Sequence, residues 1–328
     1  MESLLSFELR QPVTLQEAVS AMAANPDARL LAGGTDLVPN LRRGIEQPSV
    51  LVSLARVAGL QDMAFDASGL RLGAGVTLAR LASDAALQLH YPAIAEAAAA
   101  VAGPSHRSAA TLGGNLCQDT RCVFYNQSEW WRAANSYCLK RGGDVCHVAP
   151  QGARCHAAFS GDIAPALLAL GAEVELVSTR GARRLPLADL YRDDGAAHLL
   201  LARDEMLLRV LVPAPSSAQR SGYRKARTRG AMDFPLAGVA CALALQSGVL
   251  TELRLALTGT NSQPFVLDGT EALIGRPLSD AGLAALGKLV QKQVSPMRST
   301  ATQSNYRRLV ASALAQRLVR ELAGGAAC

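Results

Sequence analysis

The sequence predicts an α+β protein of two domains, with a cysteine-rich insert in the first domain. Helical and strand-like periodicities alternate as far as residue 212. Pro213-Ala214-Pro215 then interrupts the pattern, and three strand-like segments followed by helices complete the chain, an order typical of a small α+β domain. The length of 328 residues suffices for two or three domains. We therefore expect domains at residues 1–215 and 216–328, with an insert loop at residues 117–158.

The first domain is expected to begin with a helix. Thr14-Leu15-Gln16-Glu17 is a capping box, and apolar residues follow at helical spacing until Asn25-Pro26 ends the helix. Bounded apolar runs then predict strands at residues 29–32, 49–54, 70–73, 172–178 and 205–212. Helices are predicted at residues 77–82, 92–101 and 162–170. Gly103 to His106 should end the second of these helices and leave His106 in a loop.

The second domain is expected to place its strands before its helices. Strand patterns cover residues 223–227, 238–245 and 250–258, and a turn at Gly259 to Ser262 follows them. Helical patterns cover residues 270–273, 280–293 and 303–322.

Two similar Gly-Gly motifs are the strongest ligand-binding signal outside the insert. They are Leu31-Ala32-Gly33-Gly34-Thr35-Asp36 and Thr111-Leu112-Gly113-Gly114-Asn115-Leu116. Such a turn after a strand can point several backbone N–H groups at an anion, so two of them are expected to hold one diphosphate from two sides. Plain tight turns are the alternative. The sequence lacks G-x-G-x-x-G, Walker and G-x-S-x-G patterns, so it does not support Rossmann, P-loop or serine-hydrolase chemistry.

Charge and hydropathy exclude several function classes. The formal net charge is +6, but the arginines are scattered, so we expect no nucleic-acid partner. No apolar run approaches the length of about 20 residues that a membrane span requires, and Met1 to Gln11 has no apolar leader core. We expect a cytoplasmic protein in which thiols stay reduced, and this favours metal binding over disulfides.

Five of the seven cysteines lie in one stretch, with the spacing C-x4-C-x15-C-x7-C-x8-C. The spacing lacks the C-x2-C pairs of structural zinc sites, and its wide gaps suit a larger group wrapped by a long loop. An iron–sulfur cluster, zinc and unligated thiols all remain open. The expected ligands are Cys122, Cys138, Cys146 and Cys155, with Cys117 as the odd one. Neighbouring aromatic residues, Trp130 and Trp131 among them, are expected to shield the site, and Cys241 and Cys328 to be inert.

Several motifs together resemble one protein family. Leu31 to Leu37, Thr111 to Asn115, Gly161-Asp162-Ile163-Ala164-Pro165, and Lys225 followed by Asp233-Phe234-Pro235 are similar to the FAD-binding medium subunits of the xanthine dehydrogenase family of molybdenum hydroxylases. The resemblance covers nearly the whole chain. It implies a two-subdomain FAD-binding domain of the vanillyl-alcohol-oxidase type and a C-terminal domain like that of the carbon monoxide dehydrogenase flavoprotein.

The same resemblance implies the residues that hold FAD. The diphosphate and flavin would lie against the two Gly-Gly motifs, Asp162 would bond the ribityl or ribose end, and Val101 and Leu207 would pack on the cofactor near Lys225. The full expected set is Leu30, Leu31, Ala32, Gly33, Gly34, Thr35, Asp36, Val101, Thr111, Gly113, Gly114, Asn115, Asp162, Leu207 and Lys225.

The insert resembles one branch of that family, the 4-hydroxybenzoyl-CoA reductases of anaerobic aromatic degradation. Residues 115–122 and 125–131 carry this likeness, and in that branch the insert holds an extra [4Fe–4S] cluster. The likeness implies a hetero-oligomer, a dimer of heterotrimers with a molybdenum-cofactor large subunit and a [2Fe–2S] small subunit. Ferredoxin would supply electrons, and no catalytic residue would lie on this chain. The alternative is an FAD subunit that uses NAD or a quinone.

Overall fold

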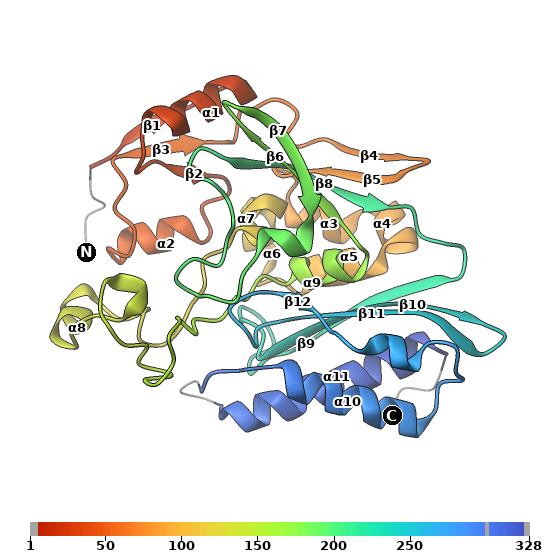
Figure 1. The fold of residues 1–328 in the computed structure, drawn as a ribbon. Coiled ribbons are helices and arrows are strands. Elements are labelled where there is room, and N and C mark those ends of the chain that lie inside the picture. The colour runs from red at the N-terminus through yellow and green to blue at the C-terminus, as the bar shows by residue number, and fades with distance from the viewer. Residues whose placement is uncertain (1–5, 299–301, 325–328) are drawn as a thin grey trace.

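The computed structural model describes residues 6–298 and 302–324, which form three β-sheets with helices between and below them (Figure 1). The first sheet is parallel, with strand order β1-β3-β2. Thr14 caps the first helix through the expected capping box, and Asn25 ends it, as predicted. The elements of this N-terminal subdomain are β1 (Glu8–Arg10), α1 (Leu15–Ala24), β2 (Arg29–Leu31), α2 (Leu37–Arg42) and β3 (Val50–Ser53).

The second subdomain contains an antiparallel sheet of order β4-β5-β8-β6-β7. Its strands are β4 (Met63–Asp66), β5 (Gly69–Gly73), β6 (Glu173–Ser178), β7 (Gly181–Pro186) and β8 (Met206–Pro213). The predicted strands at 70–73, 172–178 and 205–212 are confirmed. Sequence analysis missed β4 and β7 because both lie at sheet edges and are largely exposed, so they lack a strong apolar pattern.

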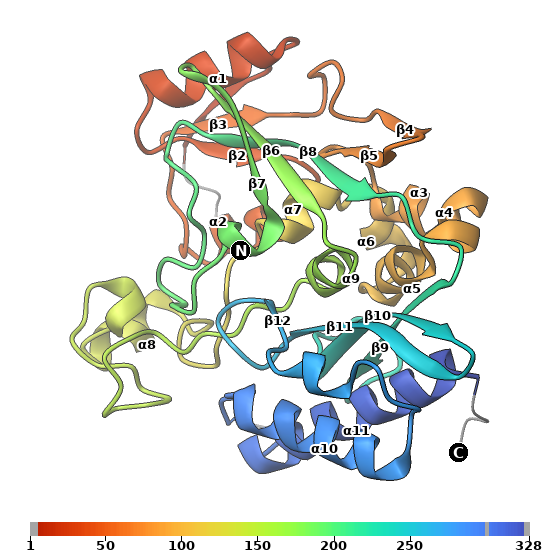
Figure 2. The same ribbon diagram turned by 45° about the vertical axis from the view of Figure 1, so that its right-hand side comes forward.

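Short helices cover the lower face of this sheet, as Figure 2 shows for α5 and α9. They are α3 (Leu78–Ser83), α4 (Ala85–His90), α5 (Pro92–Ala100), α6 (Pro104–Ala109), α7 (Leu112–Leu116) and α9 (Ile163–Ala169), with a 3-10 turn η2 (Leu187–Leu190). α9 is buried along its entire length, since it lies in the middle of the molecule. The expected loop at His106 was wrong, because Pro104 begins helix α6.

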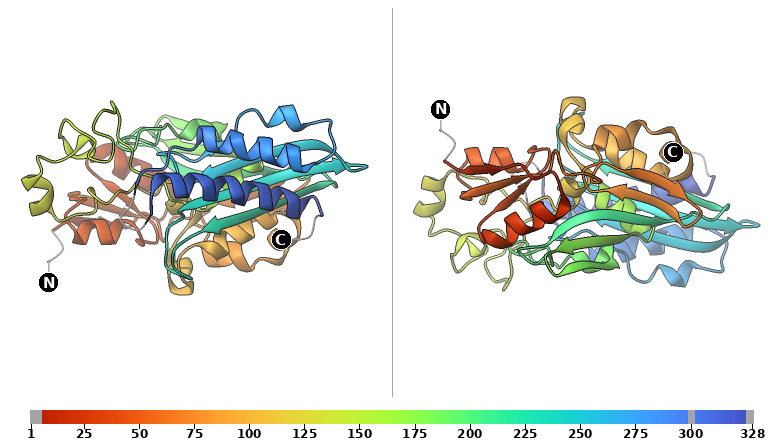
Figure 3. Two further views of the ribbon diagram at one scale, coloured as in Figure 1. Left: turned by 90° about the horizontal axis from the view of Figure 1, so that it is seen from below. Right: turned by 90° about the horizontal axis from the view of Figure 1, so that it is seen from above.

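The C-terminal domain is an antiparallel sheet with two long helices beneath it. Its elements are β9 (Gln219–Ala226), β10 (Ala237–Gln246), β11 (Val249–Thr258), β12 (Phe265–Val266), η3 (Thr270–Leu273), α10 (Asp280–Gln293) and α11 (Ser304–Leu322). The strand order is β12-β11-β10-β9. Figure 3 shows α10 and α11 side by side across the sheet. The predicted α+β order of strands followed by helices is confirmed.

Strand β10 belongs to two hydrophobic cores at once. Ala240 and Ala242 join the core shared with the first domain, whereas Val239, Cys241 and Leu243 face α10 and α11. Because side chains alternate along a strand, each face of β10 meets a different helical layer. The C-terminal sheet is thus packed directly on α5 and α9 of the first domain, and this packing fixes where β9 residues such as Lys225 meet that domain.

Candidate functional site

The first Gly-Gly motif joins β2 to α2 and leaves a row of backbone amides free. Gly34 has φ +71°, a conformation that glycine adopts without strain. Within the described residues, none of the backbone N–H groups from Ala32 to Asp36 donates a hydrogen bond to another part of the chain. Leu30 to Gly34 are partly exposed, so these donors are accessible. A run of free N–H groups on a rigid turn can bind an anionic oxygen.

The second Gly-Gly motif differs from this expectation, because it is the first turn of helix α7. Thr111 is the N-cap and accepts a hydrogen bond from Gly114 N at 3.1 Å. Leu112 N donates to Val76 O and Gly113 N to Ala74 O, each at 2.8 Å. The prediction that this motif offers free amides was wrong, because its N–H groups are used inside the fold. Gly113 is needed for another reason: a Cβ there would lie 2.9 Å from that of Ala74.

The two motifs nevertheless lie next to each other. A Cβ on Gly33 would overlap with the backbone carbonyl of Ala109, two residues before Thr111. Gly33 therefore permits close backbone approach to Ala109, and Gly113 permits it to Ala74, in each case between segments that are distant in the sequence. Gly114 remains exposed beside this contact, while Asn115 is buried and accepts from Ile163 N at 3.1 Å. The two motifs thus lie side by side, and only the first offers a row of free donors.

Asp162 and Lys225 meet in the interior, between α9 and the C-terminal sheet. Lys225 Nζ donates to Asp162 Oδ2 at 3.0 Å and to the carbonyl of Ala100 at 3.2 Å. The hydroxyl of Tyr223 donates to Asp162 Oδ1 at 2.5 Å. Burial raises the pKa of Asp162, and Lys225 and Tyr223 oppose that shift. Sequence analysis missed Tyr223, although its position two residues before Lys225 on a strand places both side chains on one face.

The other two expected contacts lie around this pair. Val101 caps the end of α5 directly after Ala100, and its side chain is partly exposed. Leu207 is buried in β8, whose neighbour Leu208 accepts from Ala74 N at 3.0 Å. Ala74 in turn accepts from Gly113, so β8 lies beside α7. The fold brings Val101, Asp162 and Lys225 together, and it places Leu207 in the adjoining core.

The cysteine insert is a loop closed at its base by Arg121 and Ala158. Each of these residues donates its N–H to the carbonyl of the other at 2.9 Å. The loop carries α8 (Glu129–Ala134) and the 3-10 turn η1 (Leu139–Arg141), and it projects from the body on the side of α2 (Figures 1 and 2). The returning arm of the loop is bound to the body next to this base, since Cys155 O accepts from Gly195 N at 2.9 Å and from Ser262 Oγ at 3.1 Å.

All four cysteines expected as ligands line one small cavity in the insert. They are Cys122, Cys138, Cys146 and Cys155, together with Phe124, Tyr125, Leu139, Lys140, His147 and Val148. Two backbone N–H groups point at the sulfurs: Tyr125 N lies 3.3 Å from Cys122 Sγ, and Ala157 N lies 3.4 Å from Cys155 Sγ. Burial raises the pKa of Cys155 to about 11, against the effects of Ala157 and Lys140. Soft sulfur donors with N–H···S bonds are the ligand type of iron–sulfur centres.

The side chains around this cavity are not arranged to hold a single metal ion. Within the described residues, no three His, Cys, Asp or Glu side chains are grouped so as to hold one metal ion. Zinc would require four sulfurs about 2.3 Å from one centre, and so in near contact with one another. The four cysteines line one common small cavity.

The remaining described cysteines lie outside the cavity, in or against the hydrophobic cores. Cys241 lies in the core of the C-terminal domain, as predicted, while Cys117 packs against the main core, where burial raises its pKa to about 12. Cys328 lies outside the described residues. Trp131 packs on Phe124 with ring centroids 5.8 Å apart. The prediction that Trp130 shields the site was wrong, because its side chain is 77% exposed.

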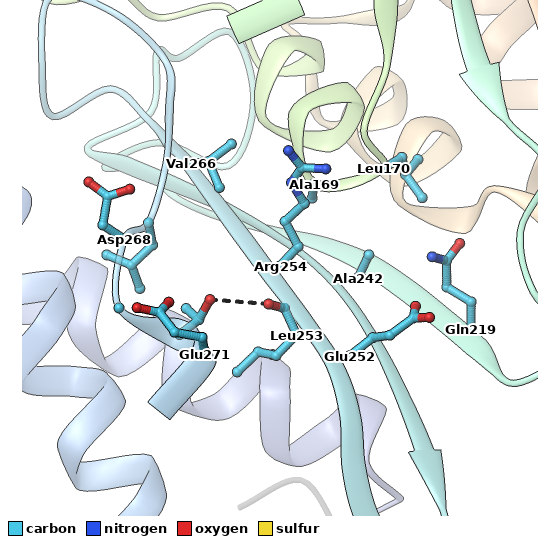
Figure 4. Close-up of a pocket in the computed structure, with 13 residues that line it drawn as sticks. Ala169, Leu170, Gln219, Ala242, Glu252, Leu253, Arg254, Val266, Asp268 and Glu271 are labelled. Atoms are coloured by element: carbon cyan, nitrogen blue, oxygen red, sulfur yellow. Dashed lines mark hydrogen bonds between the residues drawn. The ribbon is translucent and has the colours of Figure 1, made fainter. Parts of the chain in front are cut away.

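A larger groove of about 570 Å³ lies elsewhere, between the end of α9 and the C-terminal sheet (Figure 4). Its rim carries Glu252, Asp268 and Glu271 against the single cation Arg254. Three carboxylates would repel a diphosphate, so this groove is not a candidate for the nucleotide. Among the described residues, no helix is both long and apolar enough to cross a bilayer.

Family models match both parts of the chain. Residues 5–215 match the FAD binding domain in molybdopterin dehydrogenase, and residues 221–322 match the CO dehydrogenase flavoprotein C-terminal domain. The chain belongs to the FAD-binding medium subunits of the molybdenum hydroxylases. It is therefore a subunit of an oxidoreductase, FAD is its cofactor, and the fold expected from the sequence is confirmed.

Relatives span nearly the full length of this FAD-binding subunit. It is 28% identical over 316 residues to the xanthine dehydrogenase FAD-binding subunit of Escherichia coli O157:H7, covering 95% of this chain and 94% of that protein. It is 30% identical over 280 residues to the aldehyde oxidoreductase FAD-binding subunit PaoB of Escherichia coli K12, covering 83% and 86%. In structure it matches reconstituted CO dehydrogenase from Oligotropha carboxidovorans with TM-score 0.82 and 23% identity, covering 99% and 100%.

Proposed function

We propose that this chain is the electron-transfer subunit of a 4-hydroxybenzoyl-CoA reductase, carrying FAD and a [4Fe–4S] cluster. The observation that carries the proposal is that the four cysteines chosen from spacing line one cavity, in an insert anchored beside the first Gly-Gly loop. Membership in the molybdenum hydroxylase family supports FAD as a cofactor. The cysteine insert supports the assignment to the reductase branch of that family. The domain boundary is placed between residues 215 and 216, at the proline-rich break.

The residues around the Gly-Gly loop fit FAD. The free N–H groups from Ala32 to Asp36 would bind the diphosphate, and Gly34 gives the loop its left-handed turn. Val101 and Lys225 would lie near the ring system, with Asp162 holding the lysine in place. The proposed contact set is Leu30, Leu31, Ala32, Gly33, Gly34, Thr35, Asp36, Val101, Thr111, Gly113, Gly114, Asn115, Asp162, Leu207 and Lys225.

The cysteine cavity fits an iron–sulfur cluster by the chemistry of its donors. Four thiols supply the full ligand set, and each would lose its proton on binding the metal. The N–H groups of Tyr125 and Ala157 would bond the sulfurs, and the aromatic lining would limit water, two factors that set a cluster's reduction potential. FAD can exchange single electrons with such a centre, which is the chemistry this pairing supplies.

The proposed partners and overall reaction are those implied by the resemblance to the 4-hydroxybenzoyl-CoA reductases. Ferredoxin would donate electrons, and a [2Fe–2S] small subunit and a molybdenum large subunit would receive them, in a dimer of heterotrimers. The whole enzyme would remove the phenolic hydroxyl of 4-hydroxybenzoyl-CoA, using two electrons and two protons and releasing benzoyl-CoA and water. We place the protein in the cytoplasm, where the thiols would remain reduced. No substrate chemistry is assigned to this chain.

A second candidate function rests on the relatives. A xanthine dehydrogenase subunit and an aldehyde oxidoreductase subunit match this chain over most of its length. An FAD subunit that transfers electrons to NAD or a quinone, with an iron-free insert, is therefore the alternative. On this chain the two candidates differ in whether the insert holds a cluster, so the insert is the feature to measure.

The deciding experiment is iron analysis with absorption and electron paramagnetic resonance spectra of the anaerobically purified protein, before and after dithionite. We expect bound FAD and about four iron atoms per chain, as one cubane contains. The Cys138→Ser variant should keep FAD and lose the iron signal, whereas Cys117→Ser, outside the cavity, should keep both. A flavin spectrum with no iron would reject the reductase proposal and support the alternative.

A further inference from the structure

Asp36, the last residue of the free-amide loop, is bound to the base of the cysteine insert. Arg121 Nη2 donates to Asp36 Oδ1 at 2.9 Å and also to the side-chain oxygen of Asn40 in α2. The backbone N–H of Asp119 reaches the other oxygen of Asp36 at 3.4 Å. Two groups of the insert base therefore bind one carboxylate of the flavin loop.

The same network continues to the cysteine cavity. Lys140 Nζ donates to Asp119 Oδ1 at 2.6 Å and to both oxygens of Thr120. Lys140 also lines the cavity, and its ammonium lies 4.5 Å from the centre of the Tyr125 ring. The charges alternate in space as Asp36, Arg121, Asp119 and Lys140, so each one has a partner of opposite sign.

These ion pairs are protected from solvent on the insert side. The side chain of Arg121 is 10% exposed and that of Lys140 is 7% exposed. A pair that is shielded in this way depends on its geometry more than a surface pair does, because water does not replace a lost partner. Arg121 is in addition held by its backbone pairing with Ala158 at the base of the insert. The free-amide loop is thereby bonded directly to the base of the insert.

We infer that Arg121 is a positioning residue that couples the flavin loop to the cysteine insert, so that FAD binding and cluster retention stabilise each other. This inference rests on the proposed function. Its physical reason is that each cofactor would order one side of the Asp36–Arg121 contact, and the second cofactor would then meet a site that is already ordered. Thermodynamic linkage requires the effect to be reciprocal.

The test compares the FAD dissociation constant of the cluster-loaded protein with that of the chelator-treated, iron-free protein, measured by flavin fluorescence under reducing conditions. We expect FAD to bind about tenfold more tightly when the cluster is present, a typical size for coupling between sites. Arg121→Met should bring this ratio close to one. Arg141→Met is the matched control, since Arg141 lies in the insert and its side chain forms no hydrogen bond or ion pair within the described residues; it should retain the wild-type ratio.

A second variant covers the case in which Arg121→Met does not load iron. Asn40→Leu removes an acceptor of Arg121 from the side of α2, without altering the insert or any proposed ligand. It should reduce the ratio, and an unchanged ratio in an Asn40→Leu protein that carries both cofactors would overturn the inference. Equal FAD affinities in loaded and iron-free wild-type protein would overturn it as well, and so would an equal loss in Arg141→Met. A wild-type protein that takes up no iron would instead reject the proposed function.

Discussion

Lys225 Nζ lies 3.0 Å from Asp162 Oδ2, and each of the two side chains is only 4% exposed. Lys225 belongs to the C-terminal sheet and Asp162 to the N-terminus of α9, so this ion pair joins the two domains at the centre of the molecule. Tyr223 supplies a further bond to the same carboxylate. The pair is thus both a structural link and a part of the proposed flavin surroundings.

Replacing Lys225 by methionine should destabilise the protein strongly at neutral pH. The change leaves the Asp162 carboxylate buried without its cation, and losing one partner of a buried pair costs about 3–5 kcal/mol. The measurement is urea unfolding of the flavin-free protein at pH 7. The Asp162→Asn/Lys225→Met double variant removes both charges and should recover most of the loss; a double variant as unstable as the single one would contradict this account.

The loss of unfolding free energy in Lys225→Met should become smaller at acidic pH. Burial raises the pKa of Asp162 in the folded state, and loss of Lys225 removes an interaction that opposes this rise. A group whose folded pKa is raised contributes stability that is present below its unfolded pKa and is lost as pH rises through its folded pKa. When urea unfolding is measured between pH 4 and 7, the unfolding free energies of the variant and of wild type should therefore approach each other at the acidic end. Asp162 is protonated there and no longer needs a cation.

Glu205 should show the opposite pH dependence. Hydrogen bonds from Arg183 at 2.7 and 2.8 Å hold the pKa of Glu205 below its ordinary value. Its stabilisation is present above the unfolded pKa and is lost as pH falls through the lowered folded pKa. Because Arg183 is half exposed, Glu205→Gln should cost only about 1 kcal/mol at pH 7, and almost nothing near pH 3. The control is Glu173→Gln, whose pair with Arg184 is exposed on both sides; it should change stability by about 0.5 kcal/mol or less.

Alanine substitutions at the two glycines of the first motif should have different effects on stability and FAD binding. Gly34→Ala forces a side chain into a left-handed conformation, which costs about 1–2 kcal/mol, and it leaves the loop in place. Gly33→Ala drives a methyl group into the carbonyl of Ala109, so it should separate the two motifs and weaken FAD binding by about tenfold or more. Flavin content and FAD titration measure both effects. Gly230→Ala, with no atom within 4 Å of its Cβ, is the matched control.

Removal of iron by a chelator should loosen the insert and leave the rest of the fold intact. Residues 122–157 are held to the body at the Arg121–Ala158 base and by contacts of Lys140, Arg154 and Cys155, and the cluster would join the four cysteines to one another. Limited proteolysis should show new cuts within 122–157 and none in the sheets. A cleavage pattern that is identical with and without iron would mean that the insert is ordered by its own packing.

The sequence alone determined the local features of this protein. The capping box at Thr14, the helices at 163–169 and 280–293, and the strands on both sides of the proline-rich break follow from short-range periodicity and turn chemistry, which act over a few neighbouring residues. The family likeness and the choice of Cys122, Cys138, Cys146 and Cys155 were also available from motifs and spacing. The four thiols do line one cavity.

Only the tertiary structure decided which of these groups are free, buried or paired. In the folded chain the amides of Leu112 and Gly113 bond to Val76 and Ala74, and Trp130 is exposed. Asp162 is buried against Lys225 and Tyr223, and Asp36 pairs with Arg121 across 85 positions. Such outcomes depend on which distant segment occupies the space beside a residue. A local pattern contains no information about that neighbour, because packing and hydrogen bonding between remote segments are settled only when the whole chain folds.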